Sequence, residues 1–171
     1  MLNGVLNAVI FIIACSISSF VFGFLHELGH IAMYRIFGGN NDWSIIIGAG
    51  NPVLKTKKIT VNLLFMMPGF VKWSISKAKK IHAILWVSGG FLINILIAIV
   101  ILIVIFYLRQ QFPVDDFDVW SYDYFLRIAF FTNLIYVIFT IIPMEYKFGS
   151  LKGMPSDGLW IYRICRGKLD R

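Results

Sequence analysis

Three long apolar stretches alternate with shorter polar stretches along this 171-residue chain. Residues 1–25 contain no charged side chain, and neither do residues 83–108. In the third stretch, residues 124–142, the only charged side chain is Arg127. A helix that crosses a bilayer needs about 20 predominantly apolar residues. The pattern therefore predicts three membrane-spanning helices, at residues 5–37, 82–108 and 124–143, followed by a tail at residues 144–171.

Residues 43–72 follow a different pattern, in which short apolar runs are separated by turn residues. Gly48, Gly50, Asn51 and Pro52 mark one turn, and Pro68-Gly69 marks another. The runs are too short to span a membrane as helices, so we expect two to four short strands. An irregular amphipathic loop is the alternative. The predicted fold class is mainly α: a polytopic membrane protein whose three-helix core carries a small membrane-associated β segment, within a single domain over residues 1–171.

Composition and charge support a membrane location and suggest an orientation. Hydrophobic residues make up 58% of the chain, and the net charge is +7. Residues 38–80 carry seven Lys and one Asp, whereas residues 109–127 carry four Asp and two Arg. Because basic loops stay in the cytoplasm, we expect the N-terminus outside the cell membrane and the C-terminus in the cytoplasm. The Asp-rich connection that ends at Asp123 reads as a solvated loop. The lysines read as membrane-surface residues, so we expect no nucleic-acid partner.

The first predicted helix carries the motif H-E-x-x-H, at residues 26–30. His26 and His30 lie one helical turn apart, so both imidazoles can reach one zinc ion. Glu27, between them, can reach a water on that ion and act as general base. The alternative is a coincidental polar patch at a helix end. Ionisable groups at membrane depth cost about 2.5–3.5 kcal/mol each, which favours a functional explanation for three of them together.

Two further polar residues are candidates for the same site. Asn94 follows Gly89-Gly90 on the second predicted helix. It either bonds across a closely packed helix pair or points into a catalytic cavity, where an amide can orient a substrate carbonyl or stabilise an oxyanion. Asp157 precedes Gly158 in the tail, on the same predicted side of the membrane as the two histidines. Taken alone, Asp157 reads as an ordinary turn residue rather than a ligand.

The order of these motifs resembles the site-2 protease family of intramembrane zinc metalloproteases. Residues 26–30 resemble the family's H-E-x-x-H, and residues 47–71 are similar to its membrane-dipping β segment. Residues 88–94 resemble its G-P-x-x-N element, and Pro143 with residues 156–158 resembles its N-x-x-P…D-G element. The resemblance covers nearly the whole chain, and the chain has no loop long enough for the PDZ domain of some members.

The resemblance implies a role for each matching residue. His26, His30 and Asp157 would hold Zn²⁺, Glu27 would activate water, and Asn94 would position the substrate or stabilise the tetrahedral intermediate. The implied activity is zinc-dependent endoproteolysis of a transmembrane or membrane-associated peptide near the cytoplasmic leaflet. Two other functions remain open: a non-catalytic binding or immunity protein of the same fold, and a small membrane transporter. The sequence does not indicate the oligomeric state, and its richness in Ile, Lys, Asn and Phe is typical of an AT-rich bacterial genome.

Overall fold

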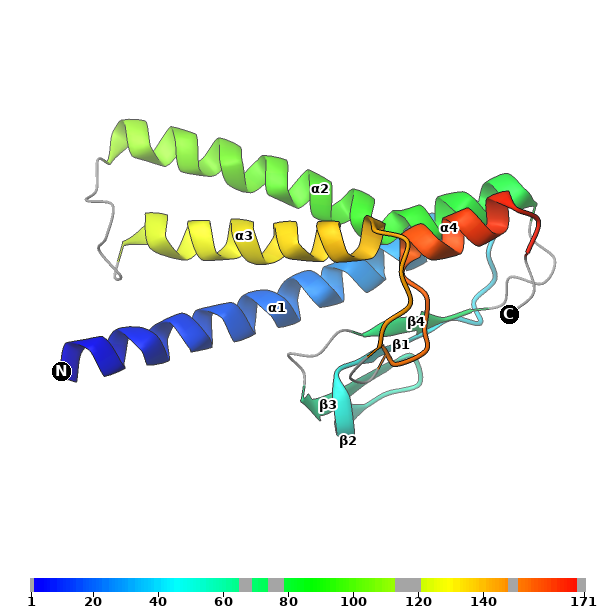
Figure 1. Ribbon diagram of the computed structural model, residues 1–171, viewed down its shortest axis with the longest axis horizontal. Coiled ribbons are helices and arrows are strands. Elements are labelled where there is room, and N and C mark those ends of the chain that lie inside the picture. The colour runs from blue at the N-terminus through cyan, green and yellow to red at the C-terminus, as the bar shows by residue number, and fades with distance from the viewer. Residues whose placement is uncertain (1, 65–68, 74–78, 113–120, 148–150, 169–171) are drawn as a thin grey trace.

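The computed structural model describes residues 2–64, 69–73, 79–112, 121–147 and 151–168. The elements follow the order α1 (Leu2–Ile36), β1 (Ser44–Ile47), β2 (Ala49–Lys55), β3 (Ile59–Leu64), β4 (Phe70–Lys72), α2 (Lys80–Gln111), α3 (Tyr122–Ile141) and α4 (Asp157–Cys165). In Figure 1, α1, α2 and α3 run side by side along the long axis, and the sheet and α4 lie towards one end. The expectation of a mainly helical fold with a small sheet between the first two long helices is confirmed.

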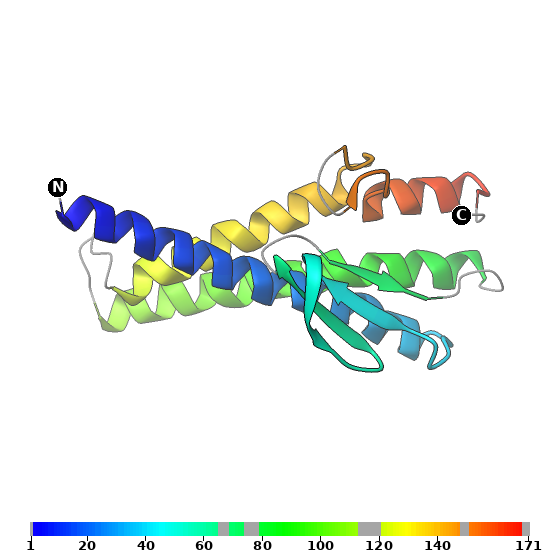
Figure 2. The same cartoon turned by 90° about the horizontal axis from the view of Figure 1, so that it is seen from below.

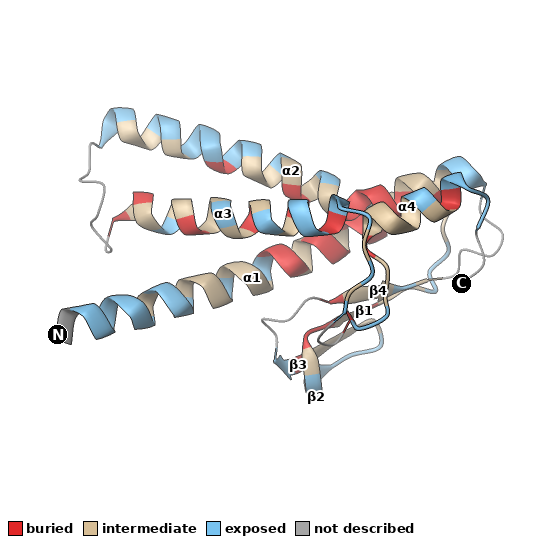
Figure 3. Ribbon diagram, in the orientation of Figure 1, coloured by how far each residue is buried: buried red, intermediate tan, exposed pale blue. Residues whose placement is uncertain are grey.

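Three helices within the described residues are long and apolar enough to cross a membrane, namely α1, α2 and α3. They leave many large hydrophobic side chains exposed, from Val5 to Val21 on α1 and from Leu92 to Tyr107 on α2. Figure 3 shows this exposure along the half of the bundle that lies away from the sheet. Helices that are apolar around their circumference are typical of membrane spans, where lipid tails surround them.

The third long segment is a discontinuous helix. α3 ends at Ile141, just before Pro143, which cannot continue the helical hydrogen bonding. The chain then makes an excursion and begins α4 at Asp157, and Figure 2 shows α4 extending beyond the end of α3 in nearly the same direction. α4 packs on α2 through a cluster of Ala83, Val87 and Ile164. The apolar residues 159–162 of the predicted tail belong to this second half-helix.

The four strands form one sheet with the order β2-β3-β1-β4. β1 pairs parallel with β3 and antiparallel with β4, and β2 pairs antiparallel with β3. Ile45 and Ile47 of β1 pack against Ile31 of α1, which docks the sheet on the first helix. The predicted turn over residues 50–52 was wrong: these residues lie within β2, where irregular register accommodates them, and only Gly48 separates β1 from β2. Residues 65–68, including Pro68 of the second predicted turn, lie outside the described residues.

A buried carboxylate ties α2 to α3 at the opposite end of the bundle. Asp123 is only 1% exposed, and it accepts hydrogen bonds from Arg109 of α2 at 2.6 and 2.8 Å and from Arg127 of α3 at 2.6 Å. The prediction that Asp123 belongs to a solvated loop was therefore wrong. Its acidic neighbours in residues 113–120 lie outside the part of the chain that the structure describes.

Candidate metal centre

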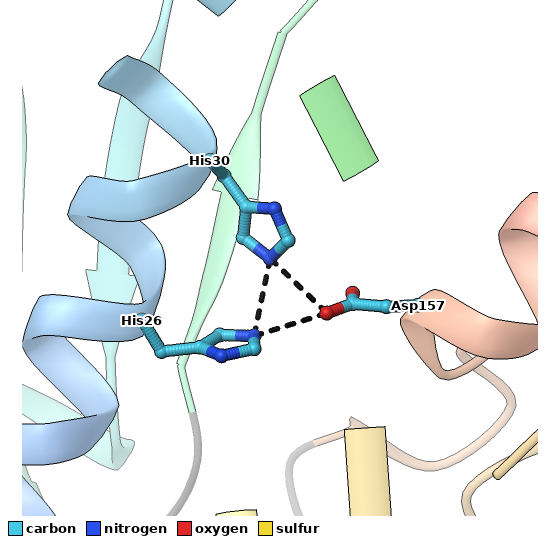
Figure 4. A group of neighbouring side chains, drawn as sticks. All are labelled: His26, His30 and Asp157. Atoms are coloured by element: carbon cyan, nitrogen blue, oxygen red, sulfur yellow. Dashed lines mark hydrogen bonds and ion pairs between the residues drawn. The ribbon is translucent and has the colours of Figure 1, made fainter. Parts of the chain in front are cut away.

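His26 and His30 lie on one face of α1 with their ring nitrogens turned towards each other. Their Nε2 atoms are 3.1 Å apart, and the side chains are almost fully buried. Figure 4 shows both rings facing the N-terminus of α4, which comes from the far end of the chain. The spacing of four residues produces this arrangement directly, because residues i and i+4 of an α-helix lie one above the other.

Asp157 completes a triangle with the two imidazoles. Its Oδ2 lies 3.2 Å from His26 Nε2 and 3.5 Å from His30 Nε2. These three residues form a group that could hold a metal ion. The sequence placed Asp157 only on the same side of the membrane as the histidines, and the structure brings the three side chains together.

The dimensions of the triangle suit zinc. Two ligands at about 2.0–2.1 Å from a tetrahedrally coordinated zinc ion are about 3.3–3.4 Å apart. The three observed separations of 3.1, 3.2 and 3.5 Å bracket this value. Two imidazole nitrogens and one carboxylate oxygen are also a donor set typical of catalytic zinc, which leaves the fourth position for water or substrate. An ion-free alternative, in which Asp157 only pairs with the two imidazoles, is compatible with the same distances.

Glycines let α2 approach the site closely. A Cβ atom added to Gly29 or Gly89 would collide with the backbone carbonyl of the other residue. A Cβ added to Gly90 would lie 2.5 Å from the Nε2 atoms of both His26 and His30. Gly89 and Gly90 thus let α2 approach the face of α1 that carries His26 and His30.

The orientation of His30 is fixed by the backbone of α2. Its Nδ1 lies 3.0 Å from the carbonyl oxygen of Trp86 and 3.3 Å from the amide nitrogen of Gly90. An Nδ1–H that donates to the Trp86 carbonyl leaves Nε2 with a free lone pair towards Asp157, which is the tautomer a metal ligand requires. Nδ1 of His26 is buried, and no group in the described chain accepts its proton.

Asp157 is positioned by Ser156, the residue directly before it. The buried Ser156 hydroxyl donates to the Ile142 carbonyl at 2.6 Å and accepts from the amides of Met144 at 3.1 Å and Leu159 at 3.2 Å. It therefore caps α4 and binds the end of α3 at the same time. The cap was not singled out from the sequence, although a Ser directly before an acidic first helical residue is a recognisable start signal.

The excursion between α3 and α4 returns the chain to its starting point. Glu145 and Pro155 form an antiparallel bridge, and the Tyr146 amide donates to the Met154 carbonyl at 2.9 Å. This pairing brings residues 145–146 alongside residues 154–155 next to the site. A Cβ on Gly158 would collide with the Ile141 carbonyl, so the start of α4 lies directly on the end of α3.

Glu27 is buried beside the triangle and interacts electrostatically with His26 and Asp157. Two tyrosines missed by the sequence analysis also lie in this region. The Tyr136 ring is 6.5 Å from the His26 ring, and its hydroxyl donates to the Ser19 carbonyl at 3.1 Å. Burial first, and then the charges of Asp157 and Glu27 and the nearby phenol of Tyr136, raise the pKa of Tyr146 to about 12.

Asn94 is fully buried one helical turn beyond Gly90. Neither atom of its side-chain amide has a hydrogen-bond partner in the described chain, whereas its backbone carbonyl accepts from Asn133 Nδ2 at 2.7 Å. Next to the site, this polar contact between α2 and α3 is made by the side chain of Asn133, for which the sequence suggested no role. The catalytic role of Asn94 stays a prediction.

Comparison of the chain with models of known protein families, with curated proteins and with solved structures found no match.

Proposed function

We propose that this protein is an intramembrane zinc metalloendopeptidase, as the resemblance to site-2 proteases implies. The observation that carries the proposal is the triangle of His26, His30 and Asp157, whose edges of 3.1, 3.2 and 3.5 Å match zinc coordination. His26, His30 and Glu27 are buried in a bundle of apolar helices, and Asp157 is half-buried beside them. Such groups are costly at membrane depth, and they therefore typically mark functional sites.

Zinc held by these three side chains would supply an activated water and polarise the scissile carbonyl. Glu27 has the role of general base, because it follows the first histidine and lies buried beside both His26 and Asp157. It takes the proton of the attacking water and passes it to the departing amine. Asp157, held by Ser156, is the third ligand, and Asn94 remains the candidate for substrate positioning.

The lipid-facing surface suggests where cleavage occurs. Apart from Ile36 and Ile81 at the other ends of the two helices, the exposed large hydrophobic residues run from Val5 to Val21 on α1 and from Leu92 to Tyr107 on α2. His26 and Gly90 lie just beyond Val21 and Leu92. The proposed zinc site therefore lies at one margin of the apolar belt rather than at its centre. Since the basic loops are on the same side, this margin is the cytoplasmic one.

The substrate is a transmembrane or membrane-associated peptide that unwinds near this margin. A helix is a poor substrate because its backbone groups are already hydrogen-bonded, so an extended strand must be stabilised. The sheet has two edge strands, β2 and β4, and β4 lies against α1. Strand addition to an edge would present an extended peptide next to the site.

Replacing Glu27 with Gln tests the proposal without removing a zinc ligand. We expect purified Glu27→Gln protein to bind one zinc ion per chain, as the wild type does, and to lose proteolysis of membrane peptides in proteoliposomes by at least about 100-fold. Wild-type protein that binds zinc and cleaves nothing would favour a non-catalytic binding protein. Ion or solute flux that requires Glu27, without proteolysis, would favour a transporter.

A further inference from the structure

We propose that Trp73 is a positioning residue that couples the edge strand β4 to the metal centre. Trp73 directly follows β4, and its ring meets that of His30 edge-on, with centroids 5.5 Å apart and an interplanar angle of 75°. Edge-to-face is a preferred arrangement of aromatic rings, so this contact favours the observed tilt of the His30 ring. The sheet thus reaches a metal-ligand candidate through an aromatic side chain.

The ring of Trp73 is itself held by three helices. It stacks on Tyr34 of α1, with centroids 5.7 Å apart and an interplanar angle of 13°. It also packs against the cluster of Ala83, Val87 and Ile164, which joins α2 to α4. Displacement of Trp73 therefore disturbs the surroundings of His30 and the packing of the half-helix that begins with Asp157.

The stacking partner Tyr34 is firmly anchored. It is 1% exposed, its hydroxyl donates to Asp42 at 2.5 Å, and its ring meets that of Trp86 edge-on at 4.7 Å. The carbonyl of Trp86 is the group that faces His30 Nδ1. His30 is therefore held from two directions: by the α2 backbone at Nδ1 and by Trp73 against its ring.

β4 can transmit a disturbance because it is short and lies at the edge of the sheet. It has three residues and pairs with β1 on one side, with Val71 opposite Ile45. A peptide added to the other side would extend the sheet immediately before Trp73. This last step rests on the proposed function, in which the sheet presents substrate, whereas the contact of Trp73 with His30 does not.

Histidine-labelled NMR of metal-free protein in detergent micelles tests the contact. The Trp73→Ala variant should shift the ring signals of His30 while those of His82 stay in place, and Trp73→Phe should restore part of the shift. Trp43→Ala is the matched control, because Trp43 packs on the cluster of Ile31, Ile45 and Ile47, and no described ring contact joins it to His30. Unchanged His30 signals in Trp73→Ala would overturn the proposal.

Two proline variants test the coupling. Val71→Pro breaks the β1–β4 pairing and should shift the ring signals of His30 as Trp73→Ala does. In protein that already carries Trp73→Ala, Val71→Pro should cause no further shift of these signals. Val53→Pro disturbs the other edge strand, β2, and should leave His30 unchanged. An equal effect of Val71→Pro with and without Trp73 would contradict coupling through this ring.

Metal release gives an independent readout. Trp73→Ala should release bound Co²⁺ to a chelator at least about tenfold faster than wild type, because changes to the groups that orient a metal ligand typically lower metal affinity by at least about that factor. The release rate of Trp73→Phe should lie closer to that of wild type. Release at the wild-type rate would contradict a positioning role. If the wild type takes up no Co²⁺, the proposed function fails, and the NMR comparison still decides the role of Trp73.

Discussion

Ser156 determines at the level of one residue where the third candidate ligand lies. Its hydroxyl makes three hydrogen bonds, to Ile142, Met144 and Leu159, and its exposed fraction is 1%. The next residue is Asp157. The position of the third candidate ligand therefore depends on a neighbouring residue that would not itself contact the metal.

Replacing Ser156 with Ala should lower zinc affinity by about 10- to 100-fold, because Asp157 loses the cap that orients it. The same change should cost about 1–2 kcal/mol in the free energy of unfolding, as loss of an N-cap does. Isothermal titration and thermal unfolding in detergent measure the two effects. Ser156→Thr keeps the hydroxyl and should retain most of the affinity. Wild-type zinc affinity in Ser156→Ala would refute the positioning role.

The raised pKa of Tyr146 predicts that the stability of the folded protein depends on pH. Its raised pKa of about 12 means that the metal-free folded protein keeps the phenol protonated where an unfolded chain, with a pKa of 10.0, ionises it. The unfolded state then binds fewer protons, so stability falls as pH rises from about 10 to about 12. Spectrophotometric titration of wild type and Tyr146→Phe should differ by one tyrosine with a midpoint near 12. If the tyrosine that is lost in Tyr146→Phe instead titrates near pH 10, this environment of Tyr146 is contradicted.

The interrupted third span is the main feature at the level of secondary-structure elements. The helices α1, α2 and α3 could be predicted from their long apolar stretches, because a lipid-facing helix needs little besides apolar composition. α4 could not, because residues 159–162 form an apolar run too short to distinguish a half-helix from a loop that packs on the bundle. Its stability comes from tertiary contacts with Ala83 and Val87 of α2.

In the sheet and the site, too, some features could be predicted from the sequence, whereas others depend on tertiary contacts. The strand residues were recognisable, but Gly50 and Pro52 read as a turn, since irregular register within β2 is decided by the pairing with β3. The two histidines follow from helix geometry alone. Tyr136, Tyr146 and Trp73 lie in distant parts of the chain, so no local spacing could connect them with His26 or His30.

The contact between α2 and α3 at the far end gives a prediction about elements. Asp123→Ala removes the acceptor shared by Arg109 and Arg127, and it should lower the free energy of unfolding by about 1–3 kcal/mol. Zinc affinity should not change, because the metal site is at the other end of α3. Glu145→Ala, which removes a partly exposed pair with Arg163 at 3.5 Å, is the control and should have little effect. A selective loss of zinc binding in Asp123→Ala would disprove this separation.

For the molecule as a whole, the distribution of charge and the apolar belt together imply an orientation. The two native cysteines report on it: Cys165 is exposed at the end of α4, and Cys15 lies within α1. A membrane-impermeant maleimide should label Cys165 in inverted vesicles and not in intact cells, while Cys15 stays unlabelled on both sides. Labelling of Cys165 from outside the cell would reverse the proposed topology.

The central claim is that His26, His30 and Asp157 hold a zinc ion. X-ray absorption at the zinc edge of purified, zinc-loaded protein tests it most directly. The account predicts a first shell of nitrogen and oxygen at about 2.0–2.1 Å, with scattering from two imidazoles, no sulfur shell near 2.3 Å, and loss of the bound zinc in Asp157→Ala. A zinc site containing sulfur, or one that is unchanged in Asp157→Ala, would contradict it.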